Sequence, residues 1–349
     1  MISVCIIAKN EETNIERCLK SLESYNFEII VVDTGSTDRT KEIALQYTNG
    51  VFDYEWADDF SGARNFAIEQ ATNDYILMID CDEYVKQLQY DQLVALIGEP
   101  KNEVGRITRV NTFWRNSEKN RIQERVSRIF NRKFFKYQGR IHEQIVRKDG
   151  EDYSTYIVPV VLEHTGYDGD VTFIKEKTSR NIRLLLLDLE EIGDDPYVLY
   201  QLGKSYYMQA DYLKACQFFS RALEHDLNPE AEFVIDLVET YGYALLNSEQ
   251  YAQALQFENI YQEFGGRPEF KFLMGLIYMN NGEFNQAIKE FDKTAQYDYA
   301  DTEGITSYKA YYNMGVIYQC LGDIKNAKIY YKKCGDYRLA QNMLSELER

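Results

Sequence analysis

The sequence predicts two structural halves: an α/β domain with a mixed, mostly parallel sheet over residues 1–170, and an all-α repeat domain after it. Three observations predict this division. Apolar runs alternate with helical patterns up to about residue 100, which is typical of strands joined by crossover helices. Strand-like runs then follow one another between residues 104 and 165. From about residue 171 the pattern is almost entirely helical and repeats itself.

The elements of the first half are predicted from short apolar runs and capping residues. Predicted strands cover residues 2–8, 28–32, 51–56, 75–79, 105–114, 125–130 and 157–162. Predicted helices cover residues 15–22, about 38–47 and 61–71. Ser36-Thr37-Asp38 is the N-cap signal for the second of these helices, and Ser61 is the signal for the third. The mixed sheet is expected to end near Gly166.

The second half contains an internal repeat. Four glycines are each followed twelve residues later by an alanine, in the pairs Gly203/Ala215, Gly242/Ala254, Gly275/Ala287 and Gly315/Ala327. The glycines lie 39, 33 and 40 residues apart, and the pattern resembles the tetratricopeptide repeat, a unit of about 34 residues with two antiparallel helices. About four repeats are expected over residues 196–349, after a connecting helix over 171–195 and ending in a capping helix. The second repeat is the least regular, because Glu258 and Tyr261 stand where apolar and small residues are expected.

Charge and cysteine content exclude several classes of protein. The 349-residue chain has a formal net charge of −17, which argues against general binding to nucleic acid or to an anionic membrane. Residues 101–148 hold fourteen lysines and arginines against four acids, so this segment either faces an anionic substrate or forms a solvated surface. The six cysteines show no metal-binding or paired spacing, which predicts a reduced, cytoplasmic protein. We find no targeting segment and no apolar run of the roughly 18 residues that span a bilayer.

The most informative stretch is an apolar strand over residues 75–79 that ends in Asp80-Cys81-Asp82-Glu83. Ligands of open α/β sheets gather at the carboxyl ends of strands, and two carboxylates one residue apart can hold a divalent cation there together with nucleotide phosphates. A solvated acidic turn is the alternative for an isolated Asp-x-Asp. Two other residues weigh against it. Asp33 ends the second strand, where it can bind a base or ribose, and Arg64 opens a helix with a guanidinium suited to a diphosphate or a base carbonyl.

Four segments carry a resemblance to a known family. In chain order they are Ile6-Ile7-Ala8-Lys9-Asn10-Glu11-Glu12, Val32-Asp33-Thr34-Gly35-Ser36-Thr37-Asp38, Ala63-Arg64-Asn65 and Asp80-Cys81-Asp82-Glu83. They resemble the family 2 glycosyltransferases over roughly residues 1–165, and within that family the branch with C-terminal helical repeats, which includes bacterial peptide and protein glycosyltransferases. The resemblance implies the GT-A (nucleotide-diphospho-sugar transferase) fold, a UDP-sugar donor, Mn²⁺ or Mg²⁺, and inversion at the anomeric carbon.

The same resemblance implies roles for residues on the donor side of the site. Ala8 and Glu11 are expected to lie against the nucleotide. Asp33 is expected to bind the uracil, and Arg64 to approach the base or the phosphates. Asp80 is expected to touch the ribose or a bridging water.

Other residues are expected to handle the metal, the diphosphate and the acceptor. Asp82 is expected to ligate the metal, and His164, which follows the last strand, is a candidate for a further metal ligand. Arg128 is expected near the donor diphosphate. Inverting transfer needs a base on the acceptor, and the Gly139-Arg140-Ile141-His142-Glu143 segment resembles a motif of this branch. Glu143 is therefore expected to be the base, with His142 orienting it or contacting a phosphate.

The leading hypothesis is a cytoplasmic glycosyltransferase for hexoses or N-acetylhexosamines that acts on a protein or peptide, with the repeats binding the acceptor. A first alternative is the same chemistry on a cell-envelope or lipid-linked glycan. The repeat half does not favour it, because residues 171–349 hold 18 basic and 27 acidic side chains. A second alternative is a scaffold protein with a relic enzyme domain, against which the intact Asp80/Asp82 pair weighs. The sugar, the acceptor atom (oxygen or sulfur) and homo-oligomerisation are left open.

Overall fold

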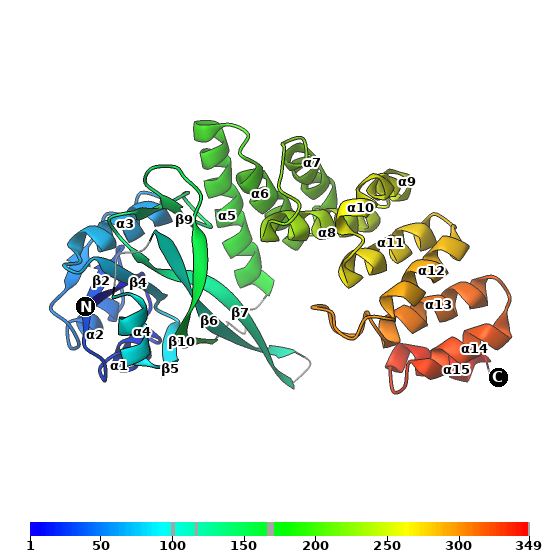
Figure 1. The fold of residues 1–349 in the computed structure, drawn as a ribbon, viewed down its shortest axis with the longest axis horizontal. Helices are drawn as coiled ribbons and strands as arrows, with labels where there is room; N and C mark the ends of the chain where they lie inside the picture. The colour runs from blue at the N-terminus through cyan, green and yellow to red at the C-terminus, as the bar shows by residue number, and fades with distance from the viewer. Residues whose placement is uncertain (99–101, 116–117, 166–170, 348–349) are drawn as a thin grey trace. The chain divides into compact units, whose positions relative to one another are not determined.

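The computed structural model describes residues 1–98, 102–115, 118–165 and 171–347. The chain divides into two compact units, Met1–Asp188 and Leu189–Arg349 (Figure 1). The division falls inside helix α5 (Val171–Ile192), so this helix belongs to both units. The domain limit at residue 170 and the connecting helix over 171–195 stay predictions, and Gly166 lies outside the described residues.

The first unit is built on an eight-stranded sheet in the order β3-β2-β1-β4-β7-β6-β10-β5. Its strands are β1 (Ile2–Ala8), β2 (Phe27–Asp33), β3 (Val51–Asp53), β4 (Tyr75–Asp80), β5 (Glu83–Leu88), β6 (Glu103–Arg115), β7 (Glu118–Asn131) and β10 (Ser154–Thr165). The pairs β1–β2, β1–β4, β2–β3 and β6–β10 are parallel, whereas β4–β7, β6–β7 and β5–β10 are antiparallel. The predicted mixed, mostly parallel sheet is therefore confirmed.

Helices cover both faces of this sheet (Figure 1). They are α1 (Ile15–Lys20), α2 (Thr40–Ala44), α3 (Phe60–Gln70) and α4 (Tyr90–Leu96). On one face Val4 and Ile6 of β1 pack with Leu19 of α1, and on the other face Cys5 packs with Ala67 of α3. Successive residues of a strand point to opposite faces, so β1 is apolar apart from Ser3, because both of its sides are buried.

The N-cap predicted for α3 is wrong by two residues. Asp59 caps this helix, because its carboxylate accepts a hydrogen bond from the backbone N–H of Gly62 at 2.9 Å. Ser61 lies in the first turn, and its hydroxyl donates to the same carboxylate. A serine two positions inside a helix cannot be distinguished from a capping serine by residue type alone.

The second predicted helix also begins later than expected. α2 starts at Thr40, and the carboxylate of Asp38 accepts from the backbone N–H of Thr40 at 3.0 Å and from that of Glu12 at 3.1 Å. Asp38 thus connects two loops as well as stabilising the start of the helix. β5 was not predicted, because its polar sequence at the sheet edge has no strand-like alternation. A two-stranded sheet of β8 (Phe135–Gln138) and β9 (Gln144–Arg147) was missed as well.

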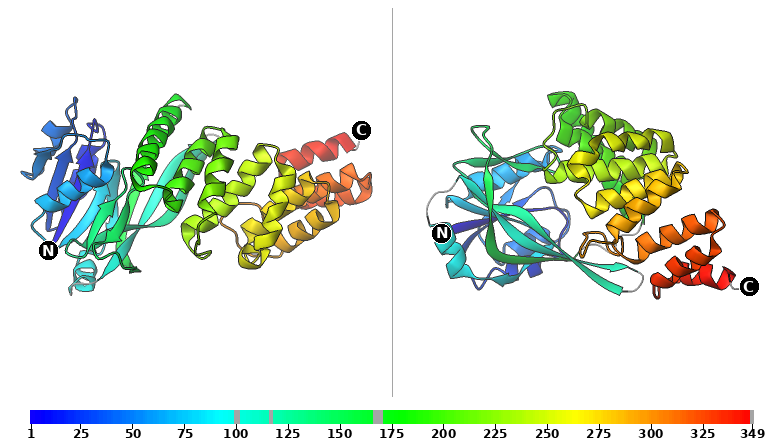
Figure 2. Two further views of the ribbon diagram at one scale, coloured as in Figure 1. Left: turned by 90° about the horizontal axis from the view of Figure 1, so that it is seen from above. Right: turned by 45° about the vertical axis from the view of Figure 1, so that its right-hand side comes forward.

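The second unit consists of paired helices, as the repeat predicts (Figure 2). The pairs are α6 (Pro196–Met208) with α7 (Tyr212–Ala222), α11 (Pro268–Asn280) with α12 (Phe284–Thr294), and α13 (Tyr308–Cys320) with α14 (Ile324–Lys333). In the second repeat α8 (Glu232–Asn247) precedes a broken helix of α9 (Tyr251–Ala254), a 3₁₀ segment (Leu255–Ile260) and α10 (Tyr261–Phe264). The capping helix is α15 (Arg338–Leu347). Among the described residues, none of the helices is long and apolar enough to cross a membrane.

The repeat glycines lie under side chains that leave no room for a Cβ. In three repeats the glycine faces an aromatic ring sixteen residues later, in the pairs Gly203/Phe219, Gly275/Phe291 and Gly315/Tyr331. A Cβ on Gly203 would lie 2.4 Å from the ring of Phe219. In the second repeat the equivalent position is Glu258, and Gly242 packs against Leu273 of the next repeat instead. The irregular second repeat thus lacks the aromatic residue that packs on the glycine in the other three repeats.

Candidate active site

Three of the predicted residues meet at one edge of the sheet because of strand register. Ala8 ends β1 beside Asp33 at the end of β2, and Asp80 at the end of β4 pairs with the residue before Ala8. These strands are parallel, so their carboxyl ends lie on the same side. β2 and β4 flank β1, which places their ends about 10 Å apart at the usual spacing of strands.

Asp33 is buried and has one oxygen without a partner. Its Oδ2 accepts hydrogen bonds from the backbone N–H groups of Gly35 and Ser36, at 3.3 Å and 3.1 Å. Gly35 has a φ of +97°, which permits this tight turn. No side chain or backbone group of the described residues reaches Oδ1 of Asp33. A buried carboxylate oxygen without a partner is costly, so this atom is an acceptor available to a ligand.

The segment after β1 is bound to the segment after β2. The carbonyl of Ala8 accepts from the backbone N–H of Thr34 at 2.9 Å. The backbone N–H of Glu11 donates to Oγ1 of Thr40 at 2.6 Å, and the Glu11 carboxylate accepts from Asn14 at 2.8 Å. These contacts keep Ala8 and Glu11 on the same side of the sheet as Asp33.

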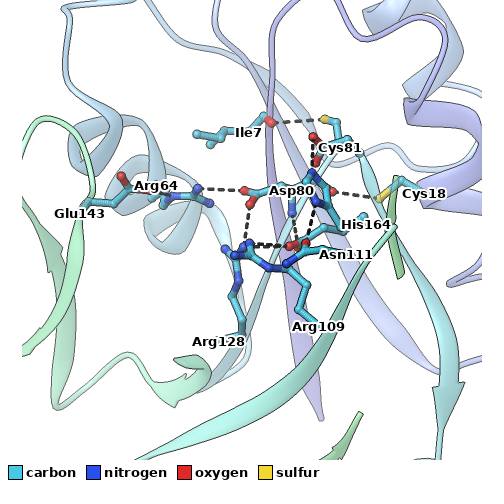
Figure 3. Close-up of polar contacts among 12 residues, drawn as sticks. Ile7, Cys18, Arg64, Asp80, Cys81, Arg109, Asn111, Arg128, Glu143 and His164 are labelled. Atoms are coloured by element: carbon cyan, nitrogen blue, oxygen red, sulfur yellow. Dashed lines mark hydrogen bonds and ion pairs between the residues drawn. The ribbon is translucent and has the colours of Figure 1, made fainter. Parts of the chain in front are cut away.

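A network of buried charges lies at the end of β4 (Figure 3). Arg64 donates from Nη2 to Asp80 at 2.8 Å and from Nε to Glu143. Arg128 donates from Nη2 to Asp80 at 2.6 Å and to Glu83 at 3.0 Å. Both oxygens of Asp80 are thus bound by guanidinium groups. The sequence places these residues on α3, β7, β5 and the loop between β8 and β9, so only the folded chain brings them together.

The contacts of the network favour the charged forms of Asp80 and Arg128. Burial opposes ionisation of Asp80, but the guanidinium groups of Arg128 and Arg64 outweigh it and hold the pKa of this carboxyl well below its usual range. Burial likewise opposes the charge of Arg128, yet Asp80 and Glu83 raise its pKa. Nη1 of Arg64 is buried without a partner among the described residues. Asp80 and Arg128 are therefore favoured in their charged forms, and Arg64 offers one unsatisfied NH₂ group.

Asp82 lies beside His164, as the two metal-ligand predictions require. Nε2 of His164 is 3.1 Å from Oδ2 of Asp82, and Nδ1 of His164 is 2.9 Å from Oδ1 of Asn111. The contact with Asp82 raises the pKa of His164 above its ordinary value, although partial burial opposes this. The two side chains are one-fifth to one-quarter exposed, so solvent and ligands can reach them.

The spacing of these two groups fits a divalent cation. Adjacent ligand atoms of an octahedral ion with bonds of about 2.1 Å lie about 3.0 Å apart, close to the 3.1 Å between Asp82 and His164. The described part of the chain holds no group of three or more His, Cys, Asp or Glu side chains arranged for a metal. A cation here would therefore take its remaining ligands from water and from phosphate oxygens, as Mg²⁺ commonly does.

The cysteine between the two aspartates does not join this site. Cys81 donates from its Sγ to the carbonyl oxygen of Ile7 at 3.3 Å (Figure 3). Burial raises the pKa of Cys81 well above its ordinary value, and the same is true of nearby Cys18. Burial thus favours the protonated form of both thiols.

The loop between β8 and β9 presents Glu143 to the network. Its His142 has a φ of +52°, an uncommon conformation for a residue with a side chain. The loop is held at Arg140, whose backbone N–H donates to Asp188 of α5 at 3.0 Å and whose carbonyl accepts from Phe60 at 2.8 Å. Nε2 of His142 lies 3.5 Å from the Asn181 amide, also on α5. Constrained backbone of this kind is often found at functional sites.

The structure brings together most of the predicted residues and adds others. Arg64, Asp80, Arg128 and Glu143 form one connected network, and Asp82 joins His164. Arg128 is bound to two carboxylates, those of Asp80 and Glu83. Its predicted contact with a diphosphate stays a prediction. Sequence reasoning missed the following partners: Glu83, Arg109, Asn111 and Glu124. Glu83 could have been singled out from the sequence, because it is the third acid after β4. The other three residues could not, because they lie on long strands with many polar residues.

Comparison with known proteins agrees with this architecture. Residues 3–151 match the family described as Glycosyl transferase family 2. Tetratricopeptide repeats match residues 197–226, 268–300 and 308–340. The unmatched stretch between the first two segments includes the irregular second repeat.

Two curated relatives share sequence with both halves. A TPR repeat-containing protein of Synechococcus elongatus is 30% identical over 71% of this chain and 62% of its own length. The SPbeta prophage-derived glycosyltransferase SunS of Bacillus subtilis is 28% identical over 68% of this chain and 57% of its own length. The chain thus spans less than two thirds of the length of either relative.

Among solved structures, TarS of S. aureus (residues 1–349, in complex with UDP-GlcNAc) matches 84% of this chain and 90% of its own, at 15% identity and a TM-score of 0.37. The family match covers strands β1 to β7 of the sheet, the Asp80/Asp82 motif and the loop that carries Glu143, and it ends before β10. The repeat matches cover three of the helix pairs of the second unit. The chain therefore carries a domain of glycosyl transferase family 2, followed by tetratricopeptide repeats.

Proposed function

We propose that this chain is an inverting, metal-dependent glycosyltransferase that moves a sugar from a UDP-sugar to a protein or peptide. The observation that carries the proposal is one sheet edge with two complementary sites. Asp33 offers a buried acceptor oxygen without a partner at the end of β2, and Asp82 with His164 offers two atoms at the spacing of adjacent ligands of one cation, after β4. A nucleoside diphosphate needs both, because its base and its phosphates lie at opposite ends.

The donor-binding roles follow from these positions. Asp33 accepts a hydrogen bond from the uracil N–H, with Ala8 and Glu11 beside the nucleotide. Asp80 is 30% exposed and fixed by two guanidinium groups, so its remaining lone pairs face the ribose or a bridging water. Asp82 and His164 would hold Mn²⁺ or Mg²⁺, which supplies charge neutralisation for the departing diphosphate.

Transfer itself is a single displacement at the anomeric carbon. The acceptor O–H or S–H attacks this carbon on the face opposite to UDP, the bond from the carbon to the diphosphate oxygen breaks, and UDP leaves with the electron pair. Glu143 takes the acceptor proton. Arg64 holds this carboxylate in place through its Nε–H, while its unpartnered Nη1 provides a further donor toward sugar or phosphate.

The acceptor is assigned to a protein or peptide because of the repeats. Tetratricopeptide solenoids generally present a surface to a polypeptide partner. The six cysteines are all free, five of them buried, which supports a reduced, cytoplasmic setting for this reaction. A sugar of the hexose or N-acetylhexosamine class fits a UDP donor.

Donor binding provides the first test. Calorimetry with UDP-glucose, UDP-GlcNAc, UDP-galactose and GDP-mannose, each with Mn²⁺ and with EDTA, is expected to show metal-dependent binding of at least one UDP-sugar. The variant Asp33→Ala should weaken that binding about 10- to 100-fold, because it removes a hydrogen bond to a charged acceptor. The control is Asp53→Ala, at the same register on β3 but exposed and paired with Lys41. Equal affinities of the Asp33 variant and the wild type would remove Asp33 from the nucleotide site.

Acceptor activation is tested at Glu143. The variant Glu143→Gln keeps the shape of the side chain but cannot take a proton, so kcat is expected to fall on the order of 10²- to 10⁴-fold. Donor affinity should stay within about twofold, because binding of the UDP moiety does not use this carboxylate. Steady-state kinetics together with calorimetry separates the two effects. Glu151→Gln, on an exposed turn, is the matched control, and an unchanged kcat in Glu143→Gln would assign the base elsewhere.

A further inference from the structure

We propose that Tyr137 binds the sugar of the donor, with its phenol hydroxyl as the hydrogen-bonding group. The inference rests on the proposed function and deepens it, because it assigns a residue to the sugar rather than to the nucleotide, the cation or the acceptor proton. Tyr137 lies on β8, outside the four segments that resemble the family.

The backbone of Tyr137 is fixed against helix α3. Its N–H donates to Oδ1 of Asn65 at 2.9 Å, and Nδ2 of Asn65 donates back to the Tyr137 carbonyl at 2.9 Å. Asn65 directly follows Arg64 in α3, and Arg64 joins Asp80 to Glu143 (Figure 3). The guanidinium carbon of Arg64 lies 5.5 Å from the centre of the Tyr137 ring. The ring of Tyr137 therefore borders the charged network at the end of β4.

The hydroxyl of Tyr137 has no hydrogen-bond partner among the described residues. Both hydrogen bonds of this residue use its backbone, and its ring contacts Phe130 and Arg64. Tyr137 is only 5% exposed, and a buried tyrosine hydroxyl usually has a partner, because an unmade hydrogen bond is costly. In the described part of the chain, the polar atoms that are fully enclosed and unpartnered do not include this oxygen. It therefore keeps contact with solvent, and a ligand can reach it.

Arg64 carries a second unpartnered group beside this hydroxyl, since its Nη1 has no partner among the described residues. The two groups differ in chemistry. A guanidinium only donates hydrogen bonds, whereas a neutral phenol both donates and accepts. Burial raises the pKa of Tyr137 to about 12, although the guanidinium groups of Arg64 and Arg128 oppose this, so the phenol is neutral at physiological pH. Sugar hydroxyls also donate and accept, and can therefore bind both groups.

The position of Tyr137 favours the sugar over the other parts of the two substrates. The charges that act on its hydroxyl include those of Asp80, at the end of β4, and Glu143, on the loop after β8. In the proposed function Asp80 faces the ribose or a bridging water of the donor, while Glu143 faces the acceptor. An inverting displacement places the transferred sugar between the leaving diphosphate and the incoming acceptor. A hydroxyl near both carboxylates is therefore placed to contact the sugar.

The variant Tyr137→Phe removes the hydroxyl and keeps the ring. Calorimetry in the presence of Mn²⁺ compares the binding of UDP with that of UDP-glucose, UDP-GlcNAc and UDP-galactose. The affinity for UDP should stay within about twofold of the wild type, whereas the affinity for the UDP-sugar that the wild type binds best should fall about 3- to 10-fold, as expected for one neutral hydrogen bond. UDP has no sugar, so a loss confined to UDP-sugars locates the hydroxyl at the sugar.

Tyr153→Phe is the matched control. The Tyr153 hydroxyl donates to the carbonyl of Ile145 at 2.8 Å, and Ile145 is the register partner of Tyr137 in the β8–β9 sheet. Thermal unfolding distinguishes the two tyrosines. Tyr153→Phe should lower the unfolding midpoint, because it removes a hydrogen bond, and should leave the affinities for UDP and UDP-sugars unchanged. Tyr137→Phe should not lower the midpoint, because its hydroxyl has no partner to lose.

Three results for Tyr137→Phe would overturn the inference: an equal loss of affinity for UDP and UDP-sugars, an unchanged affinity for all of them, or an unfolding midpoint lowered as much as in Tyr153→Phe. The last result would show that the hydroxyl has a structural role. Failure of the proposed function gives a different pattern. Wild-type protein that binds no UDP-sugar contradicts the proposed function and the inference together. A wild type that binds one, with a Tyr137 variant that binds it as tightly, contradicts the inference alone.

Discussion

The variant Asp82→Asn is expected to lower sugar transfer at least about a hundredfold at saturating donor. Asparagine keeps the size of the side chain but removes the negative charge that faces His164 across 3.1 Å. A cation at an oxygen of the leaving diphosphate supplies several kcal/mol of charge stabilisation, and each 1.4 kcal/mol or so is a tenfold change in rate. Loss of the carboxylate ligand Asp82 should remove most of this effect.

Titration of the transfer rate with Mn²⁺ checks this result, and Mn²⁺ binding measured by electron paramagnetic resonance checks its cause. The variant should need a much higher Mn²⁺ concentration to reach half of its maximal rate. Asp74→Asn is the control, because Asp74 precedes the same strand but forms an exposed pair with Lys133. If Asp82→Asn bound Mn²⁺ as tightly as the wild type, Asp82 would not be the metal ligand.

The variant Arg128→Met is expected to lower the free energy of unfolding by about 3–5 kcal/mol. Removing one member of a buried ion pair leaves its partner charged and uncompensated, and this is the typical size of the loss. Here two carboxylates lose a common partner, since Arg128 contacts both Asp80 and Glu83, and the Glu83 side chain is fully buried. Asp80 keeps its contact with Arg64 and Glu83 keeps its contact with Arg109, which places the expected loss toward the lower end of this range. Methionine fills similar volume, so the loss measures the missing charge more than a cavity.

Urea unfolding followed by circular dichroism measures this difference. Lys133→Met is the control, because its pair with Asp74 is exposed and should contribute less than about 1 kcal/mol. The stability difference should also depend on pH. The guanidinium groups hold the pKa of Asp80 below its value in the unfolded chain, so the stabilisation is complete above about pH 4 and is lost as the pH falls further. A difference near zero at neutral pH would show that the network does not stabilise the fold.

The alternation of strands and helices in the first half was predictable because local patterns specify it. β1 apart from Ser3, and β4 up to Asp80, are apolar runs of the kind that a strand buried on both faces requires. The predicted ends of β2 and β4 were close enough to place Asp33 and Asp80 at one sheet edge. The limits of α2 and α3 were less predictable, because Asp38, Asp59 and Ser61 all have capping side chains and only local geometry selects one.

The repeats were also predictable from local patterns, and so was the irregularity of the second repeat. Gly203 packs under Phe219 within one helical hairpin, and this contact recurs with the same spacing in two further repeats. Where Glu258 replaces the aromatic residue, the second helix breaks into short segments. A contact between residues sixteen positions apart leaves a periodic trace in a sequence.

By itself, the sequence determined the two-part fold, the strand-end motifs and the positions of Asp33, Asp80 and Asp82, because short-range periodicity decides which residues form strands and which follow them. Only the tertiary structure decided the partners of those residues. Asp82 and His164 are 82 positions apart, and Arg64 and Glu143 are 79 apart. Their pairing depends on the register of β6, β7 and β10 and on the placement of the β8–β9 loop, which long-range packing sets. Buried charges must find opposite charges nearby, but the sequence does not say which ones until the strands are aligned.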